Sequence, residues 1–166
     1  MISKFQSAAE AVGAHVQRFD SPTAAAAYVR KISGGSVAAS PLPDPIRVSL
    51  EGVDFIEPED FPEAKVGLSF ALAGIASTGS LLLELSDTAG RTATALPLIH
   101  MVYLRASSIV PEMNSLAGAI DDLLSSRPHA YLSLTTGPSR TADIERVLTI
   151  GVHGPEELHI LILEGE

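Results

Sequence analysis

Residues 65–74, KVGLSFALAG, are the stretch that decides the predicted fold. Large apolar residues at every second position alternate with glycine, serine or alanine, and this period of two is typical of a β-strand. Residues 81–85, LLLEL, form a second apolar segment, and the loop between the two is short, which favours antiparallel pairing. We therefore predict that residues 65–74 form a central strand of a sheet.

Helix and strand patterns alternate on both sides of this strand. Ser21 and Pro22 are typical of a helix start, because the serine oxygen can accept an early amide and proline has a helical φ. Residues 158–163 are nearly all apolar, as expected of a strand covered on both faces. The expected helices cover residues 5–12, 21–33 and 111–124, and the further strands cover residues 14–19, 36–40, 53–56, 98–104, 131–134 and 158–163. We predict that residues 57–62 form a solvated loop and residues 87–91 a polar turn.

Length and charge limit the classes of function. The 166 residues suit one domain with a sizeable core. The net charge of −9, from 20 acidic and 11 basic side chains, makes a broad contact with nucleic acid unfavourable, although a local site for a small anion remains compatible with it. The N-terminus lacks a secretory signal, and no apolar run reaches the roughly 18 residues that span a bilayer. We expect a cytoplasmic protein without a membrane segment.

The chain contains no cysteine. This excludes disulfides, thiolate catalysis, zinc–thiolate sites and an all-cysteine iron–sulfur cluster within these residues. The five histidines are scattered and show neither HxH nor HExxH spacing, so we predict no metal site. His100 lies in an apolar strand and is interpreted as a core or rim residue. A triad of Ser139, His153 and Asp143 lacks the nucleophile-elbow pattern, so hydrolysis by acyl transfer is not predicted.

Three loops combine glycine with polar side chains: residues 74–80, 137–145 and 151–155. In open α/β sheets ligands bind beyond the strand ends, where glycine lets backbone amides approach an anion. The alternative is that these glycines only supply tight turns. The candidate ligand-binding residues are Thr78, Gly79, Ser80, Gly137, Ser139, Arg140, Thr141, Asp143, Glu145 and His153; no catalytic residue is assigned.

Arg140 has two interpretations that the sequence leaves open. Its planar guanidinium can bind a carboxylate or phosphate through paired hydrogen bonds. It can equally pair with Asp143 or Glu145 and so hold its own loop together.

Four motifs in this order resemble the LUD domain family, and within it lactate-utilisation protein C. They are Gly74-Ile-Ala-x-Thr-Gly-Ser80, Leu96-Pro97-x-x-His100, residues 137–145 (GPSRTADIE), and Gly151-Val-His-Gly-Pro-x-Glu-Leu-His159. The resemblance extends over about residues 65–163. Because members of the family are often longer at the N-terminus, we expect residues 1–166 to be one LUD domain without that helical extension.

The resemblance implies a fold and a function. The implied fold is a three-layer α/β sandwich around a mostly parallel sheet, like that of the NagB/RpiA/CoA-transferase group. The implied function is that of a non-redox subunit in the oxidation of L-lactate to pyruvate, together with partner proteins that carry the iron–sulfur clusters. No cofactor is expected in this chain, and its own ligand would be a small carboxylate or another small anion.

Two other functions remain open at this point. One is a stand-alone enzyme acting on a phosphorylated or CoA-linked small molecule, with Glu84 or Glu145 as its carboxylate and Arg140 as its anion clamp. The other is a regulatory module that binds a small carboxylate without chemistry. The sequence does not decide whether the chain forms a homo-oligomer.

Overall fold

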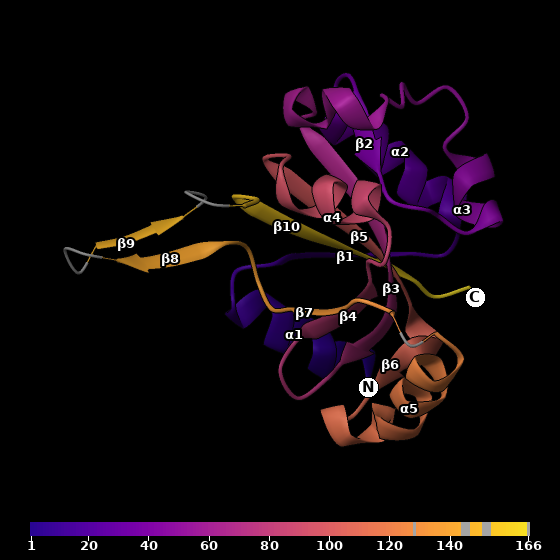
Figure 1. The fold of residues 1–166 in the computed structure, drawn as a ribbon, viewed down its shortest axis with the longest axis vertical. Coiled ribbons are helices and arrows are strands. Elements are labelled where there is room, and N and C mark those ends of the chain that lie inside the picture. The colour runs from indigo at the N-terminus through magenta and orange to yellow at the C-terminus, as the bar shows by residue number, and fades with distance from the viewer. Residues whose placement is uncertain (128, 144–146, 151–153, 166) are drawn as a thin grey trace.

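The structure is a computed structural model that describes residues 1–127, 129–143, 147–150 and 154–165. A mostly parallel sheet lies between helices, as Figure 1 shows. The helical elements are α1 (Ile2–Ala11), α2 (Pro22–Ser33), α3 (Asp44–Ser49), η1 (Pro58–Glu63), α4 (Thr88–Ala95), η2 (Ala106–Ser108), η3 (Met113–Leu116) and α5 (Ala117–Ser126). The strands are β1 (His15–Phe19), β2 (Val37–Ala39), β3 (Val66–Ile75), β4 (Ser80–Glu84), β5 (Ile99–Arg105), β6 (Ile109–Val110), β7 (Leu132–Thr135), β8 (Arg140–Asp143), β9 (Val147–Ile150) and β10 (Glu157–Leu163).

The strand β3 is central to the large sheet, whose order is β1-β10-β5-β3-β4-β7. Its first half pairs in parallel with β2 and β5, and its second half pairs antiparallel with β4 and in parallel with β6. The register shifts between Ala71 and Ala73, where β3 passes from one set of partners to the other. The predicted central strand and its antiparallel return are therefore confirmed, as is the mostly parallel α/β sheet.

Helices cover both faces of the sheet. On one face Phe5 of α1 shares a buried cluster with Leu158 and Ile160 of β10. On the other face Val29 of α2 shares a second cluster with Leu161. Successive residues of a strand point to opposite faces, so a strand buried on both sides must be apolar throughout. This explains the nearly continuous apolar run of β10.

The start and end of α2 follow from local chemistry. The Ser21 hydroxyl accepts a hydrogen bond from the Ala24 amide at 3.3 Å, and Pro22 is the first helical residue. Gly34 ends the helix with a φ of +58°, a left-handed conformation that glycine adopts without strain. The predicted helix over residues 21–33 is confirmed.

Three short segments differ from the prediction. Residues 88–91 belong to α4, because the Asp87 carboxylate accepts a hydrogen bond from the Gly90 amide at 2.6 Å and caps a helix where we had predicted a turn over residues 87–91. The loop over residues 57–62 contains the 3-10 helix η1, and Phe61 within it is buried. The predicted strand at residues 53–56 is reduced to one bridge between Val37 and Phe55.

A hairpin was also missed. The strands β8 and β9 pair antiparallel in a separate two-stranded sheet, which projects from the rest of the molecule in Figure 1. Among the described residues, every helix is too short or too polar to cross a bilayer.

Candidate functional site

A cavity of about 420 Å³ lies where α4, the start of β5, β7 and the loop after β7 meet. This volume is within the range of sites that bind small molecules, roughly 300–1,000 Å³. Its lining combines one cationic side chain with hydroxyl groups, an imidazole and apolar walls. The lining residues are Leu85, Arg91, Thr94, Ala95, His100, Tyr131, Ser133, Leu134, Thr135, Gly137, Pro138, Ser139, Gly154, Pro155 and Leu158.

His100 is the buried imidazole of this cavity. It is the second residue of β5 and is only 3% exposed. Its Nε2 atom lies 2.8 Å from the hydroxyl of Ser69 on β3, and these two atoms form a hydrogen bond. Burial lowers the pKa of His100 to about 4, because charging an imidazole away from water is unfavourable. Near pH 7 the cavity is therefore lined by a neutral histidine.

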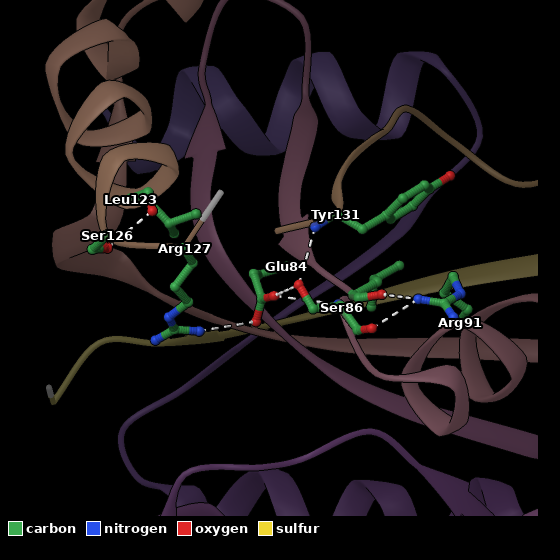
Figure 2. A network of polar contacts seen from close by, with 8 residues as sticks. Glu84, Ser86, Arg91, Leu123, Ser126, Arg127 and Tyr131 are labelled. Carbon is green, nitrogen blue, oxygen red and sulfur yellow. Dashed lines mark hydrogen bonds and ion pairs between the residues drawn. The ribbon is translucent and has the colours of Figure 1, made fainter. Parts of the chain in front are cut away.

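Arg91 of α4 supplies the cation. Its Nη1 donates to the backbone oxygens of Leu85 and Ser86, both at 2.9 Å, and its Nη2 donates to the Thr88 hydroxyl at 3.0 Å. Figure 2 shows this guanidinium beside Ser86. Three of the five N–H groups of an arginine are used in this way, and the other two have no partner among the described residues. The cation is thus fixed in position and keeps donors for an anion.

A second network fixes the wall beside Arg91 (Figure 2). The Ser86 hydroxyl donates to the Glu84 carboxylate and accepts a hydrogen bond from the Tyr131 amide at 3.0 Å. Arg127 lies 3.6 Å from the same carboxylate as an ion pair. Glu84 does not line the cavity. This carboxylate is placed to connect β4 with the segment that precedes β7.

The first predicted loop packs against α1. The hydroxyls of Thr78, Ser80 and Thr136 form a chain with two separations of 2.7 Å. Gly79 has a φ of +68°, and a Cβ atom there would lie 2.2 Å from the amide nitrogen of Ala9. The cavity lining does not include Thr78, Gly79 or Ser80. Their ligand-binding role stays a prediction.

The second predicted loop is divided between the cavity and α1. Gly137 and Ser139 line the cavity. Arg140 instead donates from Nη2 to the backbone oxygen of Val12 at 2.6 Å, just after the end of α1. The partner of Arg140 in this contact is a backbone oxygen, whereas the two interpretations above required a bound anion or a carboxylate of its own loop.

The other predicted ligand-binding residues follow Arg140 in the sequence. Thr141 and Asp143 belong to β8, and their backbones pair with Thr149 and Val147 of β9. Glu145 and His153 lie outside the described residues.

Sequence reasoning omitted Arg91 and His100 from the site. Arg91 was placed in a turn, although Asp87 three residues before Gly90 is a helix-capping pattern that predicts α4. His100 is the last residue of the motif Leu96-Pro97-x-x-His100, which could have placed it in the site. Two of the predicted residues, Gly137 and Ser139, share the cavity with them.

Several proteins of known sequence are similar to this chain. It is 31% identical to "Lactate utilization protein C" of Geobacillus sp. (strain WCH70), over 68% of this chain and 46% of that protein. It is 35% identical to "Uncharacterized protein YkgG" of Escherichia coli (strain K12), over 61% of this chain and 45% of that protein. It is 34% identical to "Uncharacterized protein NMB1437" of Neisseria meningitidis serogroup B, over 78% and 56%. The chain spans about half the length of these relatives.

A solved structure has the same fold. The crystal structure of a DUF162 family protein from Deinococcus radiodurans superposes with a TM-score of 0.72 at 19% identity, over 98% of this chain and 95% of that one. Residues 58–163 match the family model of the LUD domain, and this range includes all four motifs and every residue that lines the cavity. The predicted resemblance is confirmed, and the chain belongs to the LUD domain family.

Proposed function

We propose that this chain is a lactate-utilisation protein C-like subunit that takes part in oxidising L-lactate to pyruvate together with iron–sulfur partner proteins. Its cavity would bind the small carboxylate. The name of several relatives, lactate utilization protein C, supports the pathway, and the presence of Arg91 and His100 in the lining of one cavity supports the ligand class.

The cavity offers a recognisable set of contacts for a 2-hydroxy acid. The two remaining N–H groups of Arg91, on Nε and Nη2, would donate to the two oxygens of a carboxylate, because a guanidinium binds this group through paired hydrogen bonds. Neutral His100 is suited to a hydrogen bond with the hydroxyl of lactate or the ketone of pyruvate. Ser133 and Thr135 add hydroxyls to the same lining. We expect the fixed cation and the neutral imidazole of this cavity to orient the acid together.

Oxidation of lactate to pyruvate removes two electrons and two protons, one from C2 and one from its hydroxyl. The 166 residues contain no cysteine, so they provide no thiolate ligands for an iron–sulfur cluster. In the proposal the electrons pass to clusters in the partner proteins, and the protons leave to solvent. The chain's own task is to bind and orient the acid.

A second candidate follows from the size of the cavity. A three-carbon acid fills only part of about 420 Å³, whereas a sugar phosphate or part of a CoA-linked molecule occupies more. Arg91 would then bind a phosphate, which it recognises by the same paired hydrogen bonds. This candidate is a stand-alone enzyme of the NagB/RpiA/CoA-transferase-like group.

The test is thermal stabilisation of the purified chain by separate ligands: L-lactate, pyruvate, inorganic phosphate, CoA and ribose 5-phosphate. Ligand at about 100 times its Kd stabilises the native state by roughly 2.7 kcal/mol. We expect a shift with lactate or pyruvate that is lost in Arg91→Lys, which keeps the charge but not the planar fork. Arg140→Ala should retain the shift, because Arg140 contacts Val12.

The other outcomes are equally informative. A shift that is lost in Arg140→Ala and kept in Arg91→Lys would move the site to the sequence-predicted loop. A shift with CoA or ribose 5-phosphate alone would favour the stand-alone enzyme. Oxidation of lactate by the pure chain with a soluble electron acceptor would contradict the role of a non-redox subunit.

A further inference from the structure

A cluster of potential metal ligands lies away from the cavity, at the beginning of β1 and β10. The parallel register places His15 opposite His159, and Glu157 precedes His159 by two residues on the same strand. Residues two apart on a strand share a face of the sheet. One ligand atom from each of these three side chains lies within 4.8 Å of the other two.

The buried member of the cluster is held from both sides. His159 is 5% exposed, and its Nδ1 lies 2.9 Å from the hydroxyl of Tyr28 on α2. Its Nε2 lies 2.7 Å from a carboxylate oxygen of Glu157. The ring of His15 stands beside it, with centroids 4.8 Å apart. A hydrogen bond to one ring nitrogen of a histidine fixes the orientation of the ring, and so the direction of the other nitrogen. This is the usual arrangement around a metal-bound imidazole.

We propose that His15, Glu157 and His159 form a site for one divalent transition-metal ion of the zinc type, with Tyr28 as the outer partner that orients His159. Two imidazoles and one carboxylate are a ligand set that Zn²⁺ uses with an open fourth position. His159 would bind through Nε2 while its Nδ1–H donates to the Tyr28 oxygen.

The distances allow this site after small rotations. Zinc bonds of 2.0–2.2 Å place tetrahedral ligand atoms roughly 3.4 Å apart. His15 and Glu157 are exposed and can therefore rotate to close the 4.8 Å separation, while buried His159 stays in place. The site is separate from the cavity, because Leu158 lines the cavity and the adjacent His159 points to the opposite face of the sheet.

The test is titration of the chelator-treated full chain with Zn²⁺ by calorimetry, followed by Co²⁺ absorption spectroscopy. We expect one equivalent of Zn²⁺ to bind, with affinity lowered at least about tenfold in His15→Ala and in Glu157→Gln. Tyr28→Phe should lower it by roughly 10–100-fold, as loss of an outer partner does. The ligand variants His15→Ala and Glu157→Gln change exposed side chains, so we expect them to fold like the wild type. Circular dichroism verifies this.

Matched controls separate the site from general surface binding. His129→Ala and Glu156→Gln remove an exposed histidine and an exposed neighbouring carboxylate, and should leave the affinity unchanged. Co²⁺ should give the intense visible bands of four- or five-coordination, which are absent from octahedral aqueous cobalt. The proposal is overturned if no equivalent of Zn²⁺ binds, or if the controls weaken binding as much as His15→Ala and Glu157→Gln do. Either result is independent of the lactate experiment, which probes the other face.

Discussion

The hydroxyl of Ser69 on β3 lies 2.8 Å from Nε2 of His100 on β5, and both side chains are buried. Neighbouring parallel strands bring these two residues together. The bond satisfies one nitrogen of a histidine that has little access to water and that burial keeps neutral near pH 7.

Removing this hydroxyl should destabilise the protein. In Ser69→Ala, Nε2 of His100 loses its partner inside the fold, and an unsatisfied buried polar group costs about 1–3 kcal/mol. Chemical denaturation measures the change in the free energy of unfolding. Ser126→Ala, which removes an exposed helix-terminal hydroxyl, is the control and should cost much less. Equal losses in the two variants would show that the Ser69–His100 bond contributes no more to the free energy of unfolding than an exposed hydroxyl does.

The stability of the protein should fall as the pH drops from about 6.5 towards 4. In the unfolded chain His100 binds a proton near its ordinary pKa of 6.5, whereas in the folded protein burial lowers its pKa to about 4. Between these pH values the unfolded state binds more protons than the native state does, so the free energy of unfolding decreases as the pH falls. The full effect is on the order of 3 kcal/mol and is absent above pH 6.5.

This pH dependence can be isolated by comparing unfolding free energies of the wild type and His100→Gln between pH 4 and 7. The variant has no titrating group at this position, so its stability should vary less over this window. His129→Ala, at an exposed position, should retain the wild-type slope. A slope in His100→Gln equal to that of the wild type would contradict the prediction.

Gly79 should be much less tolerant of alanine than another glycine with a similar backbone. Its φ is +68°, and a Cβ atom would lie 2.2 Å from the Ala9 amide nitrogen of α1. Gly34 has a φ of +58° with no atom within 4 Å of its Cβ position. Gly34→Ala should therefore show the conformational cost alone, about 1 kcal/mol, and Gly79→Ala a larger loss from displacing α1. Thermal unfolding of both variants decides this, and similar losses would count against close packing of α1 on the loop.

Tyr103 carries a buried hydroxyl without a hydrogen-bond partner among the described residues. The side chain is fully buried in β5, and burial raises its pKa. Tyr103→Phe removes the unsatisfied group while keeping the ring, so it should raise the free energy of unfolding by about 1 kcal/mol.

Tyr28→Phe is the matched control for this substitution. The Tyr28 hydroxyl bonds to His159, so its removal should lower the stability. Denaturant titrations of both variants provide the comparison. A loss of stability in Tyr103→Phe would indicate that its hydroxyl is bonded in solution.

Local patterns predicted most elements of this fold. The alternating residues of β3 predicted a strand because a pleated strand presents every second side chain to the same face. The pattern at Ser21 predicted where α2 begins, because one side chain and one amide satisfy each other within a few residues. The failure at residues 87–91 arose from the polar composition of a segment whose Asp87 is a helix cap.

The candidate site was only partly predictable. Glycine-rich loops identified Gly137 and Ser139, which line the cavity. Arg91 was not identified, because its position depends on α4 packing beside the start of β5. Arg140 illustrates the same limit, since its contact with Val12 joins residues from opposite ends of the chain.

By itself the sequence determined the α/β class, the central strand, the two-sided burial of β10 and the family, because these depend on local periodicity and on motifs in order. Only the tertiary structure decided that Ser69 meets His100 and that His15 meets His159. The physical reason is that periodicity reports which face of its own element a residue occupies. The order of strands in the sheet, set by the packing of the whole core, decides which residues on that face become neighbours.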